Sequence, residues 1–246
     1  MLFEPYKKGI NTFIDNKPAI IAHRGNTGRY PENTLKAIED SIRCGVDAVE
    51  IDVRTCKDGK LVVIHDETLD RTTSGHGSVC NVTYSQIRRL DAGMGEHVPL
   101  FEEVLELVKD NVKVLIDMYA IGLEKKVIEI IRKYKILDQV AFSGNHSSLL
   151  RIKNFEPKAV LALTYEKASY AGILDSLLKR ANYYNVFYPR LNRNHIRFAH
   201  ILGLGIITWV VNDEALQELF LRSGVDAITT DKPIEALNIR RRLFGK

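Results

Sequence analysis

Cysteine, long apolar runs and an excess of one charge are all scarce in this sequence of 246 residues. The three cysteines, Cys44, Cys56 and Cys80, form neither a zinc-binding pattern nor a disulfide framework, which favours a reducing, cytoplasmic compartment. No run approaches the roughly 18 apolar residues that cross a bilayer, and residues 1–8 lack the apolar core of a signal peptide. We therefore expect a protein without stable membrane insertion.

The charge is nearly balanced, with 35 Lys and Arg residues against 31 Asp and Glu residues. The resulting net charge of +4 does not argue for a nucleic-acid partner. The one basic run, residues 240–242, is interpreted as the exposed end of a helix, where the helix dipole favours basic side chains.

Short apolar, β-branched runs alternate with amphipathic segments along the chain. This alternation predicts parallel strands joined by crossover helices. Eight strand–helix pairs in about 250 residues match the size of a (β/α)8 TIM barrel, and an open doubly wound sheet is the alternative. The expected strands are 19–22, 47–53, 112–118, 139–143, 159–164, 184–188, 205–211 and 226–230, and the expected helices are 33–44, 101–109, 122–134, 146–154, 171–181, 193–202, 213–222 and 233–243.

Residues 66–100 interrupt the alternation after a short extra strand over 60–65. The segment is rich in Gly, Thr and Asp, so we expect an insertion beside the carboxyl ends of the barrel strands, where it could cover an active site. Repeats, low-complexity tracts and linkers are not evident, and we expect one domain over residues 1–246.

Carboxylates and histidines recur at the ends of the early strands. Glu50 and Asp52 lie two residues apart in an apolar strand and therefore share a face. Two adjacent carboxylates repel one another unless a proton or a cation lies between them, and a hard divalent cation prefers oxygen ligands. His23 and His65 follow neighbouring apolar runs and could transfer protons. This combination indicates metal-assisted hydrolysis.

Together these stretches resemble the glycerophosphodiester phosphodiesterase family. The resemblance implies a barrel that cleaves glycerophosphodiesters to glycerol 3-phosphate and an alcohol, with one divalent cation, Mg²⁺ or Ca²⁺, and a small-molecule phosphodiester as its partner. The order and spacing of the matching motifs are specific, and they span nearly the whole chain. The motifs are His23-Arg-Gly25, Pro31-Glu-Asn-Thr34, residues 45–53, Lys57-Asp-Gly59, His65-Asp66, Arg71-Thr-Thr73, Leu90-Asp-Ala-Gly93, Trp209-Val-Val-Asn212 and residues 230–233.

The resemblance also implies roles for individual residues. Glu50 and Asp52 match two metal ligands of the family, and His23 and His65 match its general acid and base. Arg24 matches an arginine that binds phosphate, and a guanidinium group can donate to two phosphate oxygens at once.

The strand over 112–118 departs from the family pattern, which has Glu-x-Lys at this point. Asp117 stands at the glutamate position as the third metal ligand, with a side chain one methylene shorter. Tyr119 stands at the lysine position in the substrate site, where it can donate one hydrogen bond but brings no positive charge. A replacement cation could come from another loop, and the candidates are His146, Arg190 and Arg193.

Some assignments have plainer alternatives. Arg24 could instead form an ion pair with Glu32. Trp209 matches a position that faces the substrate, where a flat apolar wall suits the carbon face of glycerol, but it could equally be a core residue.

Three further polar residues are expected to support the site. Asp231 is expected to hold a loop and not to bind metal. Asp66 and Asn33 are expected to orient the catalytic side chains, because catalytic rings need a defined orientation.

Two other functions stay open at this point. The same chemistry could act on a lysophospholipid or another phosphodiester head group, and Tyr119 is the residue that favours this reading. The chain could also be a binding barrel without turnover, but the presence of both histidines and both carboxylates argues against it.

Overall fold

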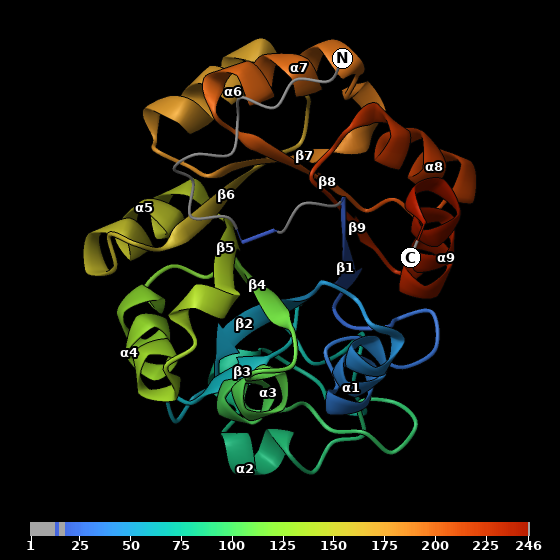
Figure 1. The fold of residues 1–246 in the computed structure, drawn as a ribbon. Coiled ribbons are helices and arrows are strands. Elements are labelled where there is room, and N and C mark those ends of the chain that lie inside the picture. The colour runs from blue at the N-terminus through green and yellow to red at the C-terminus, as the bar shows by residue number, and fades with distance from the viewer. Residues whose placement is uncertain (1–12, 15–17, 246) are drawn as a thin grey trace.

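Eight parallel strands close into a barrel in the computed structural model, which describes residues 13–14 and 18–245 (Figure 1). The barrel closes because β1 pairs in parallel with both β2 and β9. This confirms the TIM barrel and excludes the open sheet. The barrel strands are β1 (Ala19–His23), β2 (Ala48–Thr55), β4 (Lys113–Met118), β5 (Val140–Gly144), β6 (Val160–Tyr165), β7 (Tyr183–Phe187), β8 (Gly205–Trp209) and β9 (Ala227–Thr230).

A long helix leads from each barrel strand towards the next, and these helices surround the barrel (Figure 1). Every expected strand and helix is confirmed, with boundaries that differ by a few residues at most. The helices are α1 (Leu35–Cys44), α3 (Phe101–Val108), α4 (Glu124–Tyr134), α5 (His146–Phe155), α6 (Tyr170–Leu178), α7 (Arg193–Leu202), α8 (Glu214–Ser223) and α9 (Pro233–Phe244).

The first helix shows why its boundaries could be predicted. The Thr34 side chain accepts a hydrogen bond from the Ala37 amide, which satisfies one of the free N–H groups at the helix start. Gly45 ends the helix in the left-handed conformation, with φ of 80°. Only glycine adopts this conformation without steric cost, so the helix stops there.

Side-chain alternation along β2 divides the core into two parts. Val49, Ile51 and Val53 point outward and join the apolar layer between strands and helices. Ala48 points inward and joins a smaller apolar layer at the amino-terminal end of the barrel interior. Since residues i and i+2 of a strand share a face, Glu50 and Asp52 also point inward, above this layer. The interior is therefore apolar at one end and acidic at the other.

The segment between β3 (Leu61–Val63) and α3 carries the insertion. β3 pairs antiparallel with β2 and lies outside the closed barrel. Residues 64–100 contain the 3-10 helix η1 (Val79–Asn81) and the short helix α2 (Tyr84–Ile87). Leu69, Val79 and Ile87 are buried in a separate apolar cluster beneath this segment. The insertion therefore packs as an ordered layer beside the barrel mouth.

The described part of the chain contains no helix that combines the length and the apolar character needed to cross a membrane.

Candidate active site

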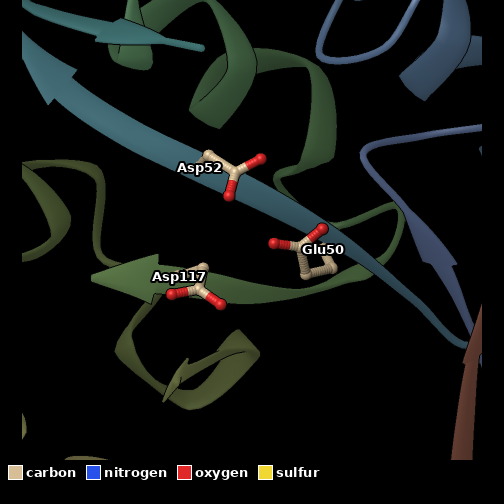
Figure 2. Close-up of side chains that lie close together, drawn as sticks. All are labelled: Glu50, Asp52 and Asp117. Carbon is tan, nitrogen blue, oxygen red and sulfur yellow. The ribbon is translucent and has the colours of Figure 1, made fainter. Parts of the chain in front are cut away.

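Three carboxylates meet inside the carboxyl-terminal end of the barrel. Glu50 and Asp52 come from β2, and Asp117 comes from the adjacent β4 (Figure 2). Strand register places Asp117 directly beside Asp52. One oxygen from each of the three carboxylates lies within 4.8 Å of the others, and Glu50 and Asp52 are only 4% and 5% exposed.

This arrangement is electrostatically unfavourable by itself. Burial, followed by the charges of Asp52 and Asp117, raises the pKa of Glu50 well above its ordinary value. Burial, followed by the charge of Asp52, raises the pKa of Asp117 to about 8. The Ser143 hydroxyl donates to Asp117 Oδ2 at 3.3 Å, whereas Oδ1 is buried without a hydrogen-bond partner. Three converging carboxylates with an unsatisfied oxygen are a donor set suited to a hard divalent cation.

Gly144 at the end of β5 makes room for Asp117. A Cβ atom at this position would lie 2.4 Å from Asp117 Oδ1, well inside van der Waals contact. The residue also has a φ of 108°, which side chains with a Cβ rarely adopt. Gly144 is therefore part of the acidic site, although it was not singled out from the sequence.

His23 ends β1 and is held by a carboxylate from the opposite end of the chain. Its Nδ1 lies 2.7 Å from Asp231 Oδ1, just after β9. Burial opposes ionisation of Asp231, but hydrogen bonds from His23, Asn212 and Thr27 lower its pKa to about 2. An ionised Asp231 accepts a hydrogen bond from Nδ1–H and leaves Nε2 for proton transfer. That Nε2 lies 4.0 Å from Glu50 Oε2.

His65 follows β3 and forms a second histidine–aspartate pair. Its Nδ1 lies 2.7 Å from Asp66 Oδ1. Hydrogen bonds from Arg71 are the main cause that lowers the pKa of Asp66, so this carboxylate also accepts a hydrogen bond from the ring Nδ1–H. The His65 backbone carbonyl accepts a hydrogen bond of 2.6 Å from Arg54 Nε. Both histidines therefore present Nε2 as the free ring nitrogen.

Arg24 directly follows β1 and contacts both the carboxylate cluster and Glu32, with a φ of 56°. Its backbone amide donates to Glu50 Oε2 at 3.0 Å, and its Nη1 donates to Glu32 Oε1 at 2.8 Å. Its Nε lies 3.2 Å from Asp52 Oδ2, as an ion pair without hydrogen-bond alignment. The ion pair with Glu32, the alternative raised from the sequence, is therefore present, and Arg24 also lines the cavity.

The expected supporting residues also lie beside the site. The Asn33 side chain donates from Nδ2 to Asp52 Oδ2 at 2.8 Å. Asp66 contacts His65, as described above. Asp231 does hold a loop, since it accepts from Thr27 and Asn212. Its contact with His23 was missed, because the two residues are 208 positions apart and no local pattern connects them.

A cavity of about 150 Å³ collects the whole predicted set. The eight residues assigned from the sequence line it together: His23, Arg24, Glu50, Asp52, His65, Asp117, Tyr119 and Trp209. The proposed replacement cations do not line this cavity. His146 contacts the Thr164 carbonyl and Lys179, and Arg190 and Arg193 are exposed residues outside the lining. Among the described lining residues, Arg24 is thus the one permanent cation.

Neutral side chains complete the wall. Burial, followed by the charge of Asp117, raises the pKa of Tyr119, so its phenol is neutral and can donate a hydrogen bond. Trp209 packs against Phe187 with ring centroids 5.3 Å apart, and its Nε1 is buried without a partner. Asn185 from β7 also lines the cavity, and its Oδ1 has no partner. Asn185 was not assigned from the sequence.

The comparisons with known proteins agree with this geometry. Residues 23–235 match the Glycerophosphoryl diester phosphodiesterase family. A glycerophosphodiester phosphodiesterase from Caldanaerobacter subterraneus is 35% identical over 241 residues, covering 92% of this chain and 99% of the relative. Another from Bacillus altitudinis is also 35% identical, covering 91% of this chain and 98% of the relative.

Solved structures show the same barrel. A phosphodiesterase from Oleispira antarctica, solved with the product sn-glycerol-3-phosphate, superposes with a TM-score of 0.85 at 25% identity. The match covers 91% of this chain and 96% of that one. A structure from Agrobacterium tumefaciens superposes with a TM-score of 0.80 at 28% identity, covering 89% and 99%. The present chain thus belongs to the glycerophosphodiester phosphodiesterase family and is a phosphoric diester hydrolase.

Proposed function

We propose that this enzyme hydrolyses glycerophosphodiesters to glycerol 3-phosphate and an alcohol, with one divalent cation and two histidines that transfer protons. The observation that carries this proposal is the position of the three converging carboxylates, two of them buried. They lie in one cavity with Arg24 and with two histidines that are each oriented by an aspartate.

Glu50, Asp52 and Asp117 would hold the cation, and Mg²⁺ and Ca²⁺ are the candidates. The unpartnered Oδ1 of Asp117 and the raised pKa of both Glu50 and Asp117 support this assignment. When bound, such a cation supplies Lewis-acid stabilisation of negative charge at phosphorus.

The two histidines would divide the proton transfers. Each ring donates a hydrogen bond from Nδ1–H to an aspartate, which defines its tautomer and orientation. The Nε2 of one histidine can accept the proton of the attacking oxygen. The Nε2 of the other, when protonated, can donate to the oxygen of the departing alcohol. After one turnover the first histidine is protonated and the second is neutral. Proton exchange with water then restores the starting state of both.

Arg24 and the neutral wall would bind the rest of the substrate. Arg24 lines the cavity beside the carboxylates, and its guanidinium could contact the phosphate oxygens. The indole of Trp209 offers a flat apolar surface for the carbon face of glycerol. Tyr119 can donate a hydrogen bond from its hydroxyl. The product complex of the Oleispira antarctica relative supports glycerol 3-phosphate as the phosphorylated product.

A second candidate is the same reaction on a lysophospholipid or another head group. Tyr119 favours it, because the family position normally supplies a lysine. In this chain the side chain is neutral and 47% exposed at the cavity. A neutral, partly apolar group would accept a different alcohol more readily than an ammonium group would.

A substrate screen tests both candidates. Glycerophosphocholine, glycerophosphoethanolamine, glycerophosphoglycerol and lysophosphatidylcholine would be incubated with the enzyme, with and without EDTA, and then with added Mg²⁺ or Ca²⁺. We expect the enzyme to release glycerol 3-phosphate from the glycerophosphodiesters. EDTA should abolish this release, and an added divalent cation should restore it. Turnover in excess EDTA would refute the requirement for a divalent cation. Release of lysophosphatidic acid alone would favour the second candidate function.

A further inference from the structure

Arg71 lies in the insertion and bridges two carboxylates at the rim of the site. Its Nε and Nη2 donate to the two oxygens of Asp66, at 2.7 and 2.8 Å. Its Nη1 and Nη2 donate to the two oxygens of Glu32, at 2.7 and 2.8 Å. Bidentate contacts of this kind define the orientation of each carboxylate as well as its distance, because the guanidinium group is planar.

Each carboxylate held by Arg71 also contacts a residue of the proposed reaction. Asp66 Oδ1 accepts from His65 Nδ1, which is 2.7 Å away. Glu32 Oε1 accepts from Arg24 Nη1, which is 2.8 Å away. The result is one continuous chain of hydrogen bonds that runs from His65 through Asp66, Arg71 and Glu32 to Arg24. Arg71 is its central member and does not itself line the cavity.

The contact with Glu32 bears on the charge that Arg24 offers to a substrate. Glu32 Oε1 accepts from both arginines, while Oε2 accepts from Arg71 alone. If Arg71 were absent, both oxygens of Glu32 would be free to pair with Arg24. Glu32 would then compete with a phosphate group for the same guanidinium. Arg71 occupies Oε2 of Glu32, the oxygen that does not accept from Arg24.

We propose that Arg71 is a positioning residue of the phosphodiesterase reaction, which orients His65 through Asp66 and preserves the phosphate-binding charge of Arg24 by holding Glu32. This proposal rests on the proposed function of the site. It gives the insertion a role in the site, since one of its side chains connects the proton-transfer group to the phosphate-binding group.

The two contacts predict separable kinetic effects. In Arg71→Met, release of Glu32 onto Arg24 should raise KM about tenfold, and loss of the support for Asp66 should lower kcat about tenfold. These values are at the modest end for charged hydrogen bonds, because the Arg71 side chain is 49% exposed and solvent screens its pairs. Arg71→Lys keeps the positive charge but lacks the planar guanidinium group. Its kcat and KM should therefore lie between those of Arg71→Met and those of the natural enzyme.

The decisive experiment adds Glu32→Gln to Arg71→Met. A neutral amide cannot capture Arg24 as a carboxylate does, so the double variant should regain a KM within about threefold of the natural enzyme. Its kcat should stay low, because Asp66 still lacks Arg71. Calorimetric binding of glycerol 3-phosphate should follow KM, weaker in Arg71→Met and recovered in the double variant. Arg222→Met, which removes an exposed pair with Glu218 on α8, is the matched control and should change neither constant.

Two results would overturn the proposal: an Arg71→Met enzyme with unchanged kcat and KM, or a double variant whose KM and binding do not recover. Thermal melting checks the fold, and if Arg71→Met does not fold, Arg71→Lys with and without Glu32→Gln takes its place. Glu50→Gln and His65→Ala in the same assay report on the proposed function. Full activity in both refutes the reaction, whereas their inactivity beside a normal Arg71→Met refutes the role of Arg71 alone.

Discussion

Charged and titratable side chains enter the cavity from one half of the barrel, and uncharged side chains enter from the other. β1, β2, β4 and the loop after β3 supply the histidines, Arg24 and the three carboxylates. β5 to β9 supply neutral groups: Ser143, Thr164, Asn185, Trp209, Val210 and Thr229. The two halves occupy opposite sides of Figure 1, the first in blue to green and the second in yellow to red.

This difference separates chemistry from recognition within one cavity. Buried charges repel one another and raise pKa values, as Glu50 and Asp117 show, so a protein gains by concentrating them where a cation and a phosphate need them. The neutral half can then be shaped for the alcohol and glycerol parts of a substrate. We expect substitutions in the charged half to reduce the rate by orders of magnitude and substitutions at its border to act more weakly.

The largest effect should follow loss of one charge from the carboxylate cluster. Glu50→Gln keeps the shape of the side chain but removes a negative charge, so the affinity for the cation and the activity should both collapse. Activity with Mg²⁺ or Ca²⁺, and calorimetric titration of the cation, measure the change. Glu218→Gln on exposed α8 is the isosteric control. A Glu50→Gln enzyme with normal activity would show that the acidic cluster is not needed.

The next largest effect should come from the two histidines. His23→Ala and His65→Ala should each reduce kcat by about two orders of magnitude or more, the usual size for general acid–base catalysis. Both proteins should fold, because these residues lie at strand ends and not in the apolar layers.

A matched control exists at the amino-terminal end of the barrel. His200 also pairs with an aspartate, Asp226, but through Nε2 at 2.8 Å and outside the cavity lining. His200→Ala should leave kcat unchanged, with circular dichroism to compare the folds. Near-normal turnover in His23→Ala or His65→Ala would make that histidine structural.

A smaller effect is expected at the border between the halves. Tyr119→Lys would restore a charge-assisted contact to phosphate, and such contacts contribute about 1.5–3 kcal/mol. Because tenfold corresponds to about 1.4 kcal/mol, kcat/KM on simple glycerophosphodiesters should rise about tenfold. Tyr119→Phe removes the hydroxyl but keeps the aromatic ring, so it tests the contribution of the hydroxyl alone. A Tyr119→Lys enzyme that is slower on every substrate would mean that another group already supplies this contact.

The smallest effect concerns stability without metal. The pKa of Asp117 is about 8 in the folded protein against 3.8 ordinarily, so unfolding lets this group ionise more readily. The resulting penalty is absent below about pH 4, grows between pH 4 and 8, and is constant above. Asp117→Asn should therefore melt higher than the natural protein at pH 8 in EDTA, by roughly 2–4 °C for each 1 kcal/mol relieved.

The two proteins should melt alike near pH 4, and added divalent cation should stabilise only the protein that retains Asp117. Differential scanning calorimetry measures both. An equal difference in melting temperature at both pH values would point to packing and not to ionisation as the cause.

Periodicity along the chain predicted the barrel elements, with an open doubly wound sheet as the alternative, and placed the first two site carboxylates on one face. Alternating strand and helix patterns gave every barrel element within a few residues, because these patterns depend on contacts close in sequence. The i, i+2 rule placed Glu50 and Asp52 on one face, and the structure places both inside the barrel. The resemblance added Asp117, Arg24, Tyr119 and Trp209, and all four line the same cavity.

Tertiary structure decided the partners of these residues. Barrel closure brings β9 beside β1, and only then can Asp231 reach His23 across 208 positions. The pairing of β4 with β5 puts Gly144 against Asp117, and the folded insertion brings Arg71 to Glu32, 39 positions away. A sequence by itself determines what each strand presents and on which face, since side-chain direction follows from local backbone geometry. Which faces meet depends on how the strands close around a common core, and that is a property of the whole chain.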